Sequence, residues 1–486
     1  MVPTAGLPPD PPGRSVASFV AGLGPRDFTL LVIGGIIGDG VYVVAAMGAT
    51  FLGPAQLVAW LLAGALAAVI ALAFVQCSTI HPEVGGSYAY TKRAFGPTVG
   101  FVAGWALYAG EWVALPVFPL AFINYLTLLA PALAAPVPST LAKLALIAVA
   151  TAINIRGVRA TGLVNDVMTV AKLVPLGCFM LLGLVYAAAL PTVAAEHLTP
   201  FAPLGLGGIG SAVLLIFWAY AGFELSVLPA AEVREPRRTM PRGIVLGVAV
   251  TTAVYLLCAF AVVVAVPWAE VATSHHPVAD AAAAMFGALG WPPSLAVTIA
   301  AAGAVISIAG VYQVFMLAVA RLSYALAGEG LFPHAFGLLH ARFRTPYVGL
   351  LFQAAATFVG AVLFDLTGLI GSAVFFLGLC YILTSLSALR LVSVNPDQAL
   401  HLPALRPLLA LGALSGGYLS LQAPPEVLLG GTATIAAGLL LFLLRGRHWG
   451  GRAPAAPEHF ERHADLHHRW LWHAVRRVPP NHPHPE

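Results

Sequence analysis

The stretch Gly34-Gly35-Ile36-Ile37-Gly38-Asp39-Gly40 decides the fold, because it interrupts the first long apolar segment of the chain. Each glycine weakens a helix and a carboxylate is costly in hydrocarbon, so an unbroken lipid-facing helix has no use for this composition. Irregular backbone at membrane depth persists only where it lines a cavity, and discontinuous helices mark the substrate site of many secondary transporters. The stretch therefore predicts a membrane transporter whose first span is broken around a polar ligand.

The composition of the 486-residue chain indicates a lipid bilayer rather than water as its solvent. The chain is 59% hydrophobic and 9% charged, which leaves too little polar surface for a soluble globule of this size. The net charge of +4 is no sign of nucleic-acid binding, since the Arg residues lie between apolar runs. The four cysteines lie singly, without a CxxC pair. We expect no nucleic-acid partner, no cofactor and no resident metal.

About 20 apolar residues cross the hydrocarbon core, and by that measure the sequence contains candidate transmembrane helices along most of its length. The twelve predicted spans are 27–49, 54–76, 97–128, 139–155, 161–188, 207–231, 242–266, 291–328, 346–364, 367–390, 403–421 and 425–445. With a cytoplasmic N-terminus, 22 of the 24 basic residues fall on the cytoplasmic side, as the positive-inside rule requires. The exceptions are Lys143, near an outer helix end, and Lys172, inside a span. We expect a multi-pass protein of the plasma membrane with both termini in the cytoplasm.

The predicted organisation is a single transporter domain, 26–445, between two cytoplasmic tails. The N-terminal tail, 1–25, lacks the apolar stretch of a signal peptide. The His/Arg-rich C-terminal tail, 446–486, has the composition of a disordered basic segment, with a metal-binding tail as the alternative. The amphipathic segment 77–96 and the external connection 266–290 are candidate gates, although the second fits an ordinary solvated loop equally well.

A second interruption lies in the sixth span, at Ile216-Phe217-Trp218-Ala219-Tyr220-Ala221-Gly222-Phe223-Glu224. It again sets a glycine and a carboxylate inside an apolar run of helix length. Broken first and sixth spans fit two units of five helices, and because five is odd the second unit would enter the membrane from the opposite face. The expected units are repeat one at about 26–190, repeat two at about 205–392 and extra helices at about 403–445.

Four stretches resemble the amino acid–polyamine–organocation (APC) superfamily of permeases. They are Gly34 to Val43, Pro82 to Gly96, Phe217 to Gly243, and Ala320 to Pro333 with the nearby Phe343 to Pro346. The resemblance implies an all-α integral membrane protein with 12 transmembrane helices: a leucine-transporter-type 5+5 inverted repeat with broken helices 1 and 6, plus two extra helices. It also implies that an amino acid binds between the breaks. Half-helix N-termini would offer N–H groups to its carboxylate, and the opposed C-termini would offer carbonyls to its ammonium.

At the first break, Gly35, Gly38 and Gly40 are expected to cradle the substrate carboxylate, because glycine lets backbone N–H groups approach a ligand closely. Tight helix packing through small residues is the alternative. Asp39 stands where the family commonly carries Ser or Thr. It is either protonated, directed at the substrate ammonium, or a cap of the second half-helix. If the Asp39 carboxylate faces the ligand, it favours the binding of cationic or amine substrates.

At the second break, Trp218 matches the family's aromatic position one turn before the interruption, where the ring is expected to close over the substrate. Plain packing is the alternative. Ala219 and Gly222 complete the expected substrate-binding set. Glu224 matches a position where some exchangers of the family carry a carboxylate linked to proton sensing, and an intramembrane Glu can pick up a proton. A structural hydrogen bond is the alternative.

Two further residues are expected to act with Glu224 in proton coupling. Lys172 resembles the fifth-helix lysine of proton-coupled members, whose ammonium occupies the space of a sodium ion. The alternative is a fixed ammonium that bridges the fifth and first helices. Glu111 belongs to the third span, which lines the site in this fold, and Lys172 is a candidate partner for it.

These features favour a secondary active amino acid transporter that uses protons as its coupling ion in symport. An exchanger of amino acids or polyamines is the alternative, motivated by Asp39 and Glu224. A membrane enzyme or metal-responsive receptor would rest only on the His-rich tail and on His275-His276, whereas the intramembrane acids are dispersed across spans one, three and six. We therefore expect no enzymatic activity. The sequence leaves the identity of the substrate and the oligomeric state open.

Overall fold

The computed structural model describes residues 24–81, 85–156, 158–226, 233–328, 330–400 and 402–445. The elements of these ranges are α- and 3₁₀-helices, so the described part of the chain is all-α, as predicted. The predicted tails fall outside the described residues, apart from Gly24 and Pro25. So do Pro82 to Val84 of the second motif stretch and Glu329 of the fourth.

The first half of the described chain contains the first break and the spans that follow it. Its elements are α1 (Pro25–Ile36), α2 (Gly40–Leu52), η1 (Gly53–Ala55), α3 (Gln56–Ile80), α4 (Ser87–Phe95), α5 (Pro97–Ala114), α6 (Val117–Leu129), η2 (Pro131–Ala134), α7 (Pro136–Arg156), α8 (Val158–Ala189) and α9 (Pro191–His197). Proline at the first position of α1, α5, α7 and α9 fits a place where the missing N–H costs nothing.

The second half begins with the second break and ends at the outermost helices. Its elements are α10 (Ile209–Phe217), η3 (Trp218–Tyr220), α11 (Phe223–Ser226), α12 (Pro236–Ala265), α13 (Trp268–Thr273), α14 (Pro277–Ala288), α15 (Pro293–Gly328), η5 (His334–Gly337), α16 (Tyr347–Leu363), α17 (Leu366–Val394), η6 (Pro396–Gln398), α18 (Leu405–Leu421) and α19 (Pro425–Arg445).

Within the described ranges, eight helical segments are long and apolar enough to cross a membrane. They are Gly40–Ile80, Pro97–Leu129, Pro136–Arg156, Lys172–Ala189, Arg237–Ala265, Pro293–Gly328, Leu366–Val394 and Pro425–Leu444. Ile209–Leu225 and Tyr347–Leu363 are shorter apolar helices. The chain is thus a multi-pass α-helical membrane protein, and the number of twelve spans stays a prediction.

Both interrupted helices lie at the stretches that the glycines mark. Helix α1 ends at Ile36 and α2 begins at Gly40, so three residues between them are non-helical. In the sixth span, α10 passes into the 3₁₀ turn η3 and then into Gly222, whose φ of +118° is a conformation that only glycine adopts without strain. Carbonyl groups in both stretches, among them those of Ile37 and Ala219, accept hydrogen bonds from side chains of other helices.

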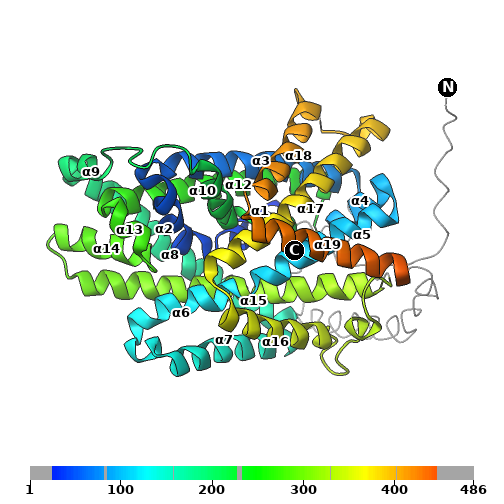
Figure 1. The fold of residues 1–486 in the computed structure, drawn as a ribbon, viewed down its shortest axis with the longest axis horizontal. Coiled ribbons are helices and arrows are strands. Elements are labelled where there is room, and N and C mark those ends of the chain that lie inside the picture. The colour runs from blue at the N-terminus through cyan, green and yellow to red at the C-terminus, as the bar shows by residue number, and fades with distance from the viewer. Residues whose placement is uncertain are drawn as a thin grey trace, which may run out of the picture.

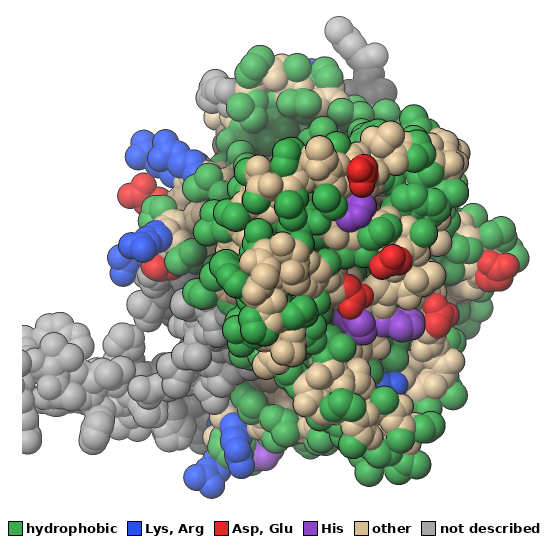
Figure 2. Space-filling model, turned by 90° about the vertical axis from the view of Figure 1, so that its left-hand side faces the viewer, with side chains coloured by type: hydrophobic (Ala, Val, Ile, Leu, Met, Phe, Trp, Pro, Cys, Tyr) green, Lys and Arg blue, Asp and Glu red, His purple; other side chains and the backbone are tan. Residues whose placement is uncertain are grey.

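The long helices α3, α7 and α15 run along the length of the molecule, and the short helices α4, α9 and α13 lie toward its two ends (Figure 1). Helices α7, α15 and α16 pack against one another along one side. At the left of Figure 1 lie α9, α13 and α14, and α4 lies at the right. Figure 2 shows acidic and His side chains on the face formed by the left-hand end. The outer helices expose large apolar side chains, for example Leu421 and Leu429, as expected of surfaces that face lipid.

Candidate functional site

The two breaks touch each other, backbone against backbone. A Cβ added to Gly40 would lie 2.5 Å from the Cα of Ala219, and a Cβ added to Gly222 would lie 2.6 Å from the carbonyl oxygen of Gly35. Both distances are far below van der Waals contact, so glycine is required at both positions. At Gly40 and Gly222 the geometry thus matches the packing alternative, since these glycines bring the two broken helices together.

Asp39 and Trp218 form a hydrogen bond across the contact between the breaks. The indole Nε1 of Trp218 donates to Oδ2 of Asp39 at 2.9 Å, and both side chains are buried. Asp39 occupies the N-cap position of α2 but accepts no capping hydrogen bond from that helix, so the expected cap is not formed in this structure. The Trp218 ring packs against Phe118 of α6, with ring centroids 6.1 Å apart.

The space between the breaks is nearly filled. A cavity of about 10 Å³ remains, which is close to the minimum that holds one water molecule. Its lining includes six of the predicted binding residues: Gly35, Gly38, Asp39, Gly40, Trp218 and Ala219. Phe118, Val311 and Phe315 complete its apolar wall, together with Ile36 and Ala221. A cavity of this size cannot hold an amino acid, so the two breaks are closed against each other in this structure.

Lys172 of α8 binds the peptide groups that the first break leaves without helical partners. Its Nζ donates to the carbonyl oxygens of Gly34 at 2.7 Å and of Ile37 at 2.6 Å. A cation at the carbonyl end of α1 also complements the negative end of the helix dipole. The Lys172 side chain thus joins α8 to the carbonyl end of α1.

Glu111 lies against Glu224 rather than against Lys172, the partner that the sequence suggested. The carboxyl groups of Glu111 and Glu224 adjoin each other and are buried. Oε1 of Glu224 also accepts a hydrogen bond of 2.9 Å from the backbone N–H of Gly222. Glu224 is therefore attached to the second break on one side and adjoins the third span on the other.

Two residues that sequence reasoning did not select contact the broken helices. The Tyr255 hydroxyl of α12 lies 2.9 Å from the carbonyl oxygen of Ile36 and 2.8 Å from that of Ala219, and it can donate its one hydrogen to only one of them at a time. Ser307 of α15 donates to the carbonyl oxygen of Gly38 at 3.3 Å. Such residues can be sought in a sequence, because carbonyl groups freed by a helix break require hydrogen-bond donors from neighbouring spans. Hydroxyl side chains inside apolar segments are the candidates.

No group of three or more His, Cys, Asp or Glu side chains in the described ranges could hold a metal ion. In the connection 266–290, the imidazole Nδ1 of His276 lies 2.8 Å from Oδ1 of Asp280. This ion pair or hydrogen bond joins the N-cap residue of α14 to the first turn of the same helix.

Comparisons with known proteins agree with this architecture. A family model described as amino acid permease matches residues 23–444. The relatives include a methylthioribose transporter of Bacillus subtilis, 30% identical over 68% of this chain and 72% of the relative. They also include the branched-chain amino acid permease BcaP of the same organism, 27% identical over 68% and 72% of the two chains. The serine/threonine exchanger SteT of Bacillus subtilis is 28% identical over 80% of this chain and 87% of its own. With a family model matched along nearly all of its apolar length, the chain belongs to the amino acid permease family of the APC superfamily.

Proposed function

We propose that this chain is a secondary active transporter that carries amino acids across the plasma membrane by alternating access, in symport with protons. The observation that carries the proposal is the contact between two interrupted helices, around a small cavity walled by backbone groups and by the Asp39–Trp218 pair. Membership of the amino acid permease family supports the substrate class.

In the proposed binding mode, the substrate carboxylate meets the backbone N–H groups at the start of α2, between Gly38 and Gly40, where the helix dipole is positive. Its ammonium meets the carbonyl groups at the end of η3 and the carboxylate of Asp39. Binding requires Trp218 to swing away from Asp39 and then to close over the ligand. Because Phe118, Val311 and Phe315 border the cavity, we expect amino acids with apolar side chains to fit best.

Proton coupling is proposed to involve Lys172, Glu111 and Glu224. Loss of a proton from the Lys172 ammonium would weaken its hydrogen bonds to the carbonyl oxygens of Gly34 and Ile37, and α1 could then move. The Glu111–Glu224 pair would hold one proton between two carboxyl groups, because two adjacent buried carboxylates repel each other strongly. Each protonation step thus acts on one broken helix, which is the physical basis for coupling.

The proposed topology has twelve spans within 26–445, arranged as the 5+5 inverted repeat at about 26–190 and 205–392 with extra helices at about 403–445. Both tails, 1–25 and 446–486, would lie in the cytoplasm. The distribution of basic residues supports this orientation, since 22 of the 24 Lys and Arg residues fall on the proposed cytoplasmic side.

Uptake into proteoliposomes tests the coupling. The substrate is first identified with a thermal-shift panel of the twenty amino acids, common amines and methylthioribose, because a ligand stabilises the folded state by mass action. Uptake of the strongest binder should rise with an inward proton gradient and persist without sodium. A strict sodium requirement would refute the proton assignment, and stabilisation by methylthioribose alone would refute the amino acid assignment.

Exchange is the second candidate mode, favoured by the acids at both breaks and by the likeness to the exchanger SteT. Counterflow distinguishes the two modes. If external substrate accelerates the efflux of internal substrate while a proton gradient has no effect, the chain is an exchanger. If efflux is indifferent to external substrate, exchange is excluded.

A further inference from the structure

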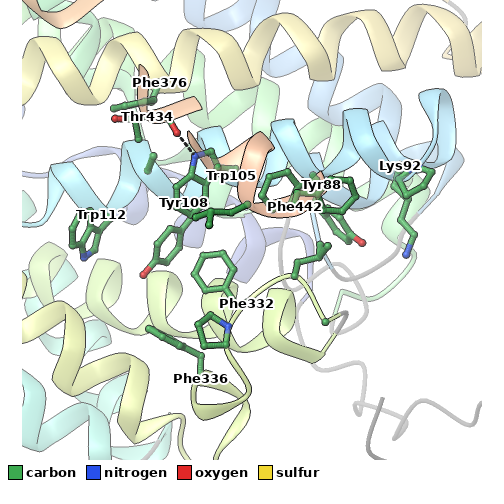
Figure 3. Close-up of a pocket in the computed structure, with 18 of the residues that line it drawn as sticks. Tyr88, Lys92, Trp105, Tyr108, Trp112, Phe332, Phe336, Phe376, Thr434 and Phe442 are labelled. Atoms are coloured by element: carbon green, nitrogen blue, oxygen red, sulfur yellow. Dashed lines mark hydrogen bonds between the residues drawn. The ribbon is translucent and has the colours of Figure 1, made fainter. Parts of the chain in front are cut away.

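A second cavity, far larger than the one between the breaks, lies on the side of the molecule. Its volume is about 710 Å³, and it is bordered by α4, α5, α16, α17, α19 and the segment after α15. Figure 3 shows its lining, with Trp112 at one end and Lys92 at the other. Neither the broken helices nor the residues proposed for proton coupling belong to it.

The cavity is a groove that runs along a membrane-spanning helix. Helix α5 lines it from Pro97 to Val113, a distance of about 24 Å at 1.5 Å per residue. The hydrocarbon core of a bilayer is about 30 Å thick, so the groove covers much of that depth. Its outer wall is α19, which is held to α5 by a hydrogen bond of 3.0 Å from the Trp105 indole to the carbonyl oxygen of Thr434.

The outer wall faces lipid. Leu441, which lines the groove, and Leu444, one turn further along α19, are 56% and 63% exposed. A hydrophobic surface of this kind on a membrane protein is in contact with acyl chains. The occupant of the groove can therefore enter from the lipid phase.

The chemistry of the walls selects an acyl chain. Aromatic rings dominate the lining: Phe101 packs on Phe442 with centroids 4.6 Å apart, and Tyr108 meets Phe332 at 4.7 Å. An inserted peptide would bring backbone N–H and C=O groups that need partners at membrane depth. A wall of this composition offers few of them, whereas an acyl chain needs none.

The end of the groove at Lys92 carries positive charge. Lys92 lines the groove, and its Nζ lies 5.3 Å from the centre of the Tyr88 ring. Arg93 follows it in the last turn of α4, and the Arg390 guanidinium lies 5.3 Å from the centre of the Phe95 ring of the same helix. Basic pockets between transmembrane helices on the cytoplasmic side bind anionic lipid headgroups. We propose that the groove binds one anionic phospholipid, with an acyl chain along α5 and the phosphate at Lys92.

Native mass spectrometry of the delipidated full chain tests this assignment, with phosphatidylglycerol and phosphatidylcholine titrated separately. We expect one phosphatidylglycerol to be retained more tightly than phosphatidylcholine. Lys92→Gln should weaken the retention of phosphatidylglycerol by about fivefold, the effect of one basic residue near an anionic headgroup. Leu441→Trp, which fills the groove, should reduce retention of both lipids. Arg406→Gln, with the same loss of charge outside the groove, and Leu429→Trp, on α19 outside the groove, are the matched controls.

Every other result overturns the proposal. If Lys92→Gln changes the retention of phosphatidylglycerol no more than Arg406→Gln does, the headgroup does not lie at Lys92. If Leu441→Trp and Leu429→Trp have equal effects, the groove does not hold the chain. If the full chain retains neither lipid, the groove does not bind a phospholipid.

Discussion

At the residue scale, the Asp39–Trp218 hydrogen bond connects the two breaks through side chains. Asp39 stands at the start of α2, beside the backbone N–H groups that are proposed to bind the substrate carboxylate. In the closed structure the Trp218 indole donates a hydrogen bond to the Asp39 carboxylate, which offsets part of the negative charge of this carboxylate. We therefore expect the bond to keep the empty site closed and to break when substrate enters.

Replacing Trp218 by Phe tests that role. The variant keeps an aromatic ring but loses the donor, so buried Asp39 loses its indole partner at a cost of about 1–3 kcal/mol. Thermal unfolding in detergent should show reduced stability, and uptake should show a lowered KM, because substrate no longer has to break this bond to enter the site. Trp112→Phe is the control, because the buried Nε1 of Trp112 has no hydrogen-bond partner to lose. Equal effects of the two substitutions would contradict a special role for Trp218.

Lys172→Ala tests the coupling residue. Removing the ammonium leaves the carbonyl groups of Gly34 and Ile37 without this donor. The position of α1 can then no longer respond to the protonation state of Lys172, so uptake should no longer depend on the proton gradient. Uptake driven by an inward gradient should fall to the level seen without one. Lys143→Ala is the matched control, since its Nζ also donates to a backbone carbonyl, that of Ala361 at 3.2 Å. A full gradient response in Lys172→Ala would remove the proposed role.

At the scale of elements, the contact between the two interrupted helices depends on glycine. Gly222→Ala places a Cβ 2.6 Å from the Gly35 carbonyl oxygen and forces an L-residue to a φ of +118°. The left-handed backbone alone costs about 1–2 kcal/mol, so the variant should unfold at a lower temperature and lose transport. Gly177→Ala in α8 meets nothing within 4 Å and should be neutral or stabilising. If both variants behave alike, the breaks are not packed as described.

A pH-dependent contact lies at the start of α14, between His276 and Asp280. The hydrogen bond to Asp280 raises the pKa of His276 above its ordinary value. A raised pKa means that the protonated form is bound more tightly in the folded state. Its contribution to stability is therefore complete below the ordinary pKa of about 6.5 and is lost as the pH rises through the raised value.

The corresponding prediction concerns the stability difference between variants. Asp280→Asn should lower the melting temperature most at about pH 5.5, and the difference from the original chain should shrink as the pH rises above the raised His276 pKa. Melting curves at several pH values measure it. His275→Asn, at the exposed neighbouring position, should leave the pH dependence unchanged. A pH-independent effect of Asp280→Asn would exclude the proposed titration.

At the scale of the whole molecule, the sequence was sufficient for the features that local composition encodes. Glycines and acids inside apolar runs located both breaks, and hydrophobic length predicted an all-α membrane protein. The resemblance of four motif stretches predicted the family. The side-chain contacts between distant helices could not be predicted from local composition. Glu111 pairs with Glu224 rather than Lys172, and Tyr255 reaches both breaks, because these pairs are set by how distant helices pack.

The state of the site was also beyond sequence reasoning. Glycines predict close approach, but they do not say whether the partner is a ligand or another helix. Here Gly40 approaches Ala219, and the cavity between the breaks shrinks to about 10 Å³. The lateral groove could not be predicted from the sequence either, because its aromatic lining comes from elements far apart in the chain.

The most direct test is an electron cryo-microscopy map of the protein with the amino acid that stabilises it most. The account predicts ligand density between Gly38–Gly40 and Ala219–Gly222, with the Trp218 indole displaced from Asp39 and both helices still interrupted. Density for the amino acid elsewhere, or first and sixth spans that run as continuous helices in that map, would contradict it.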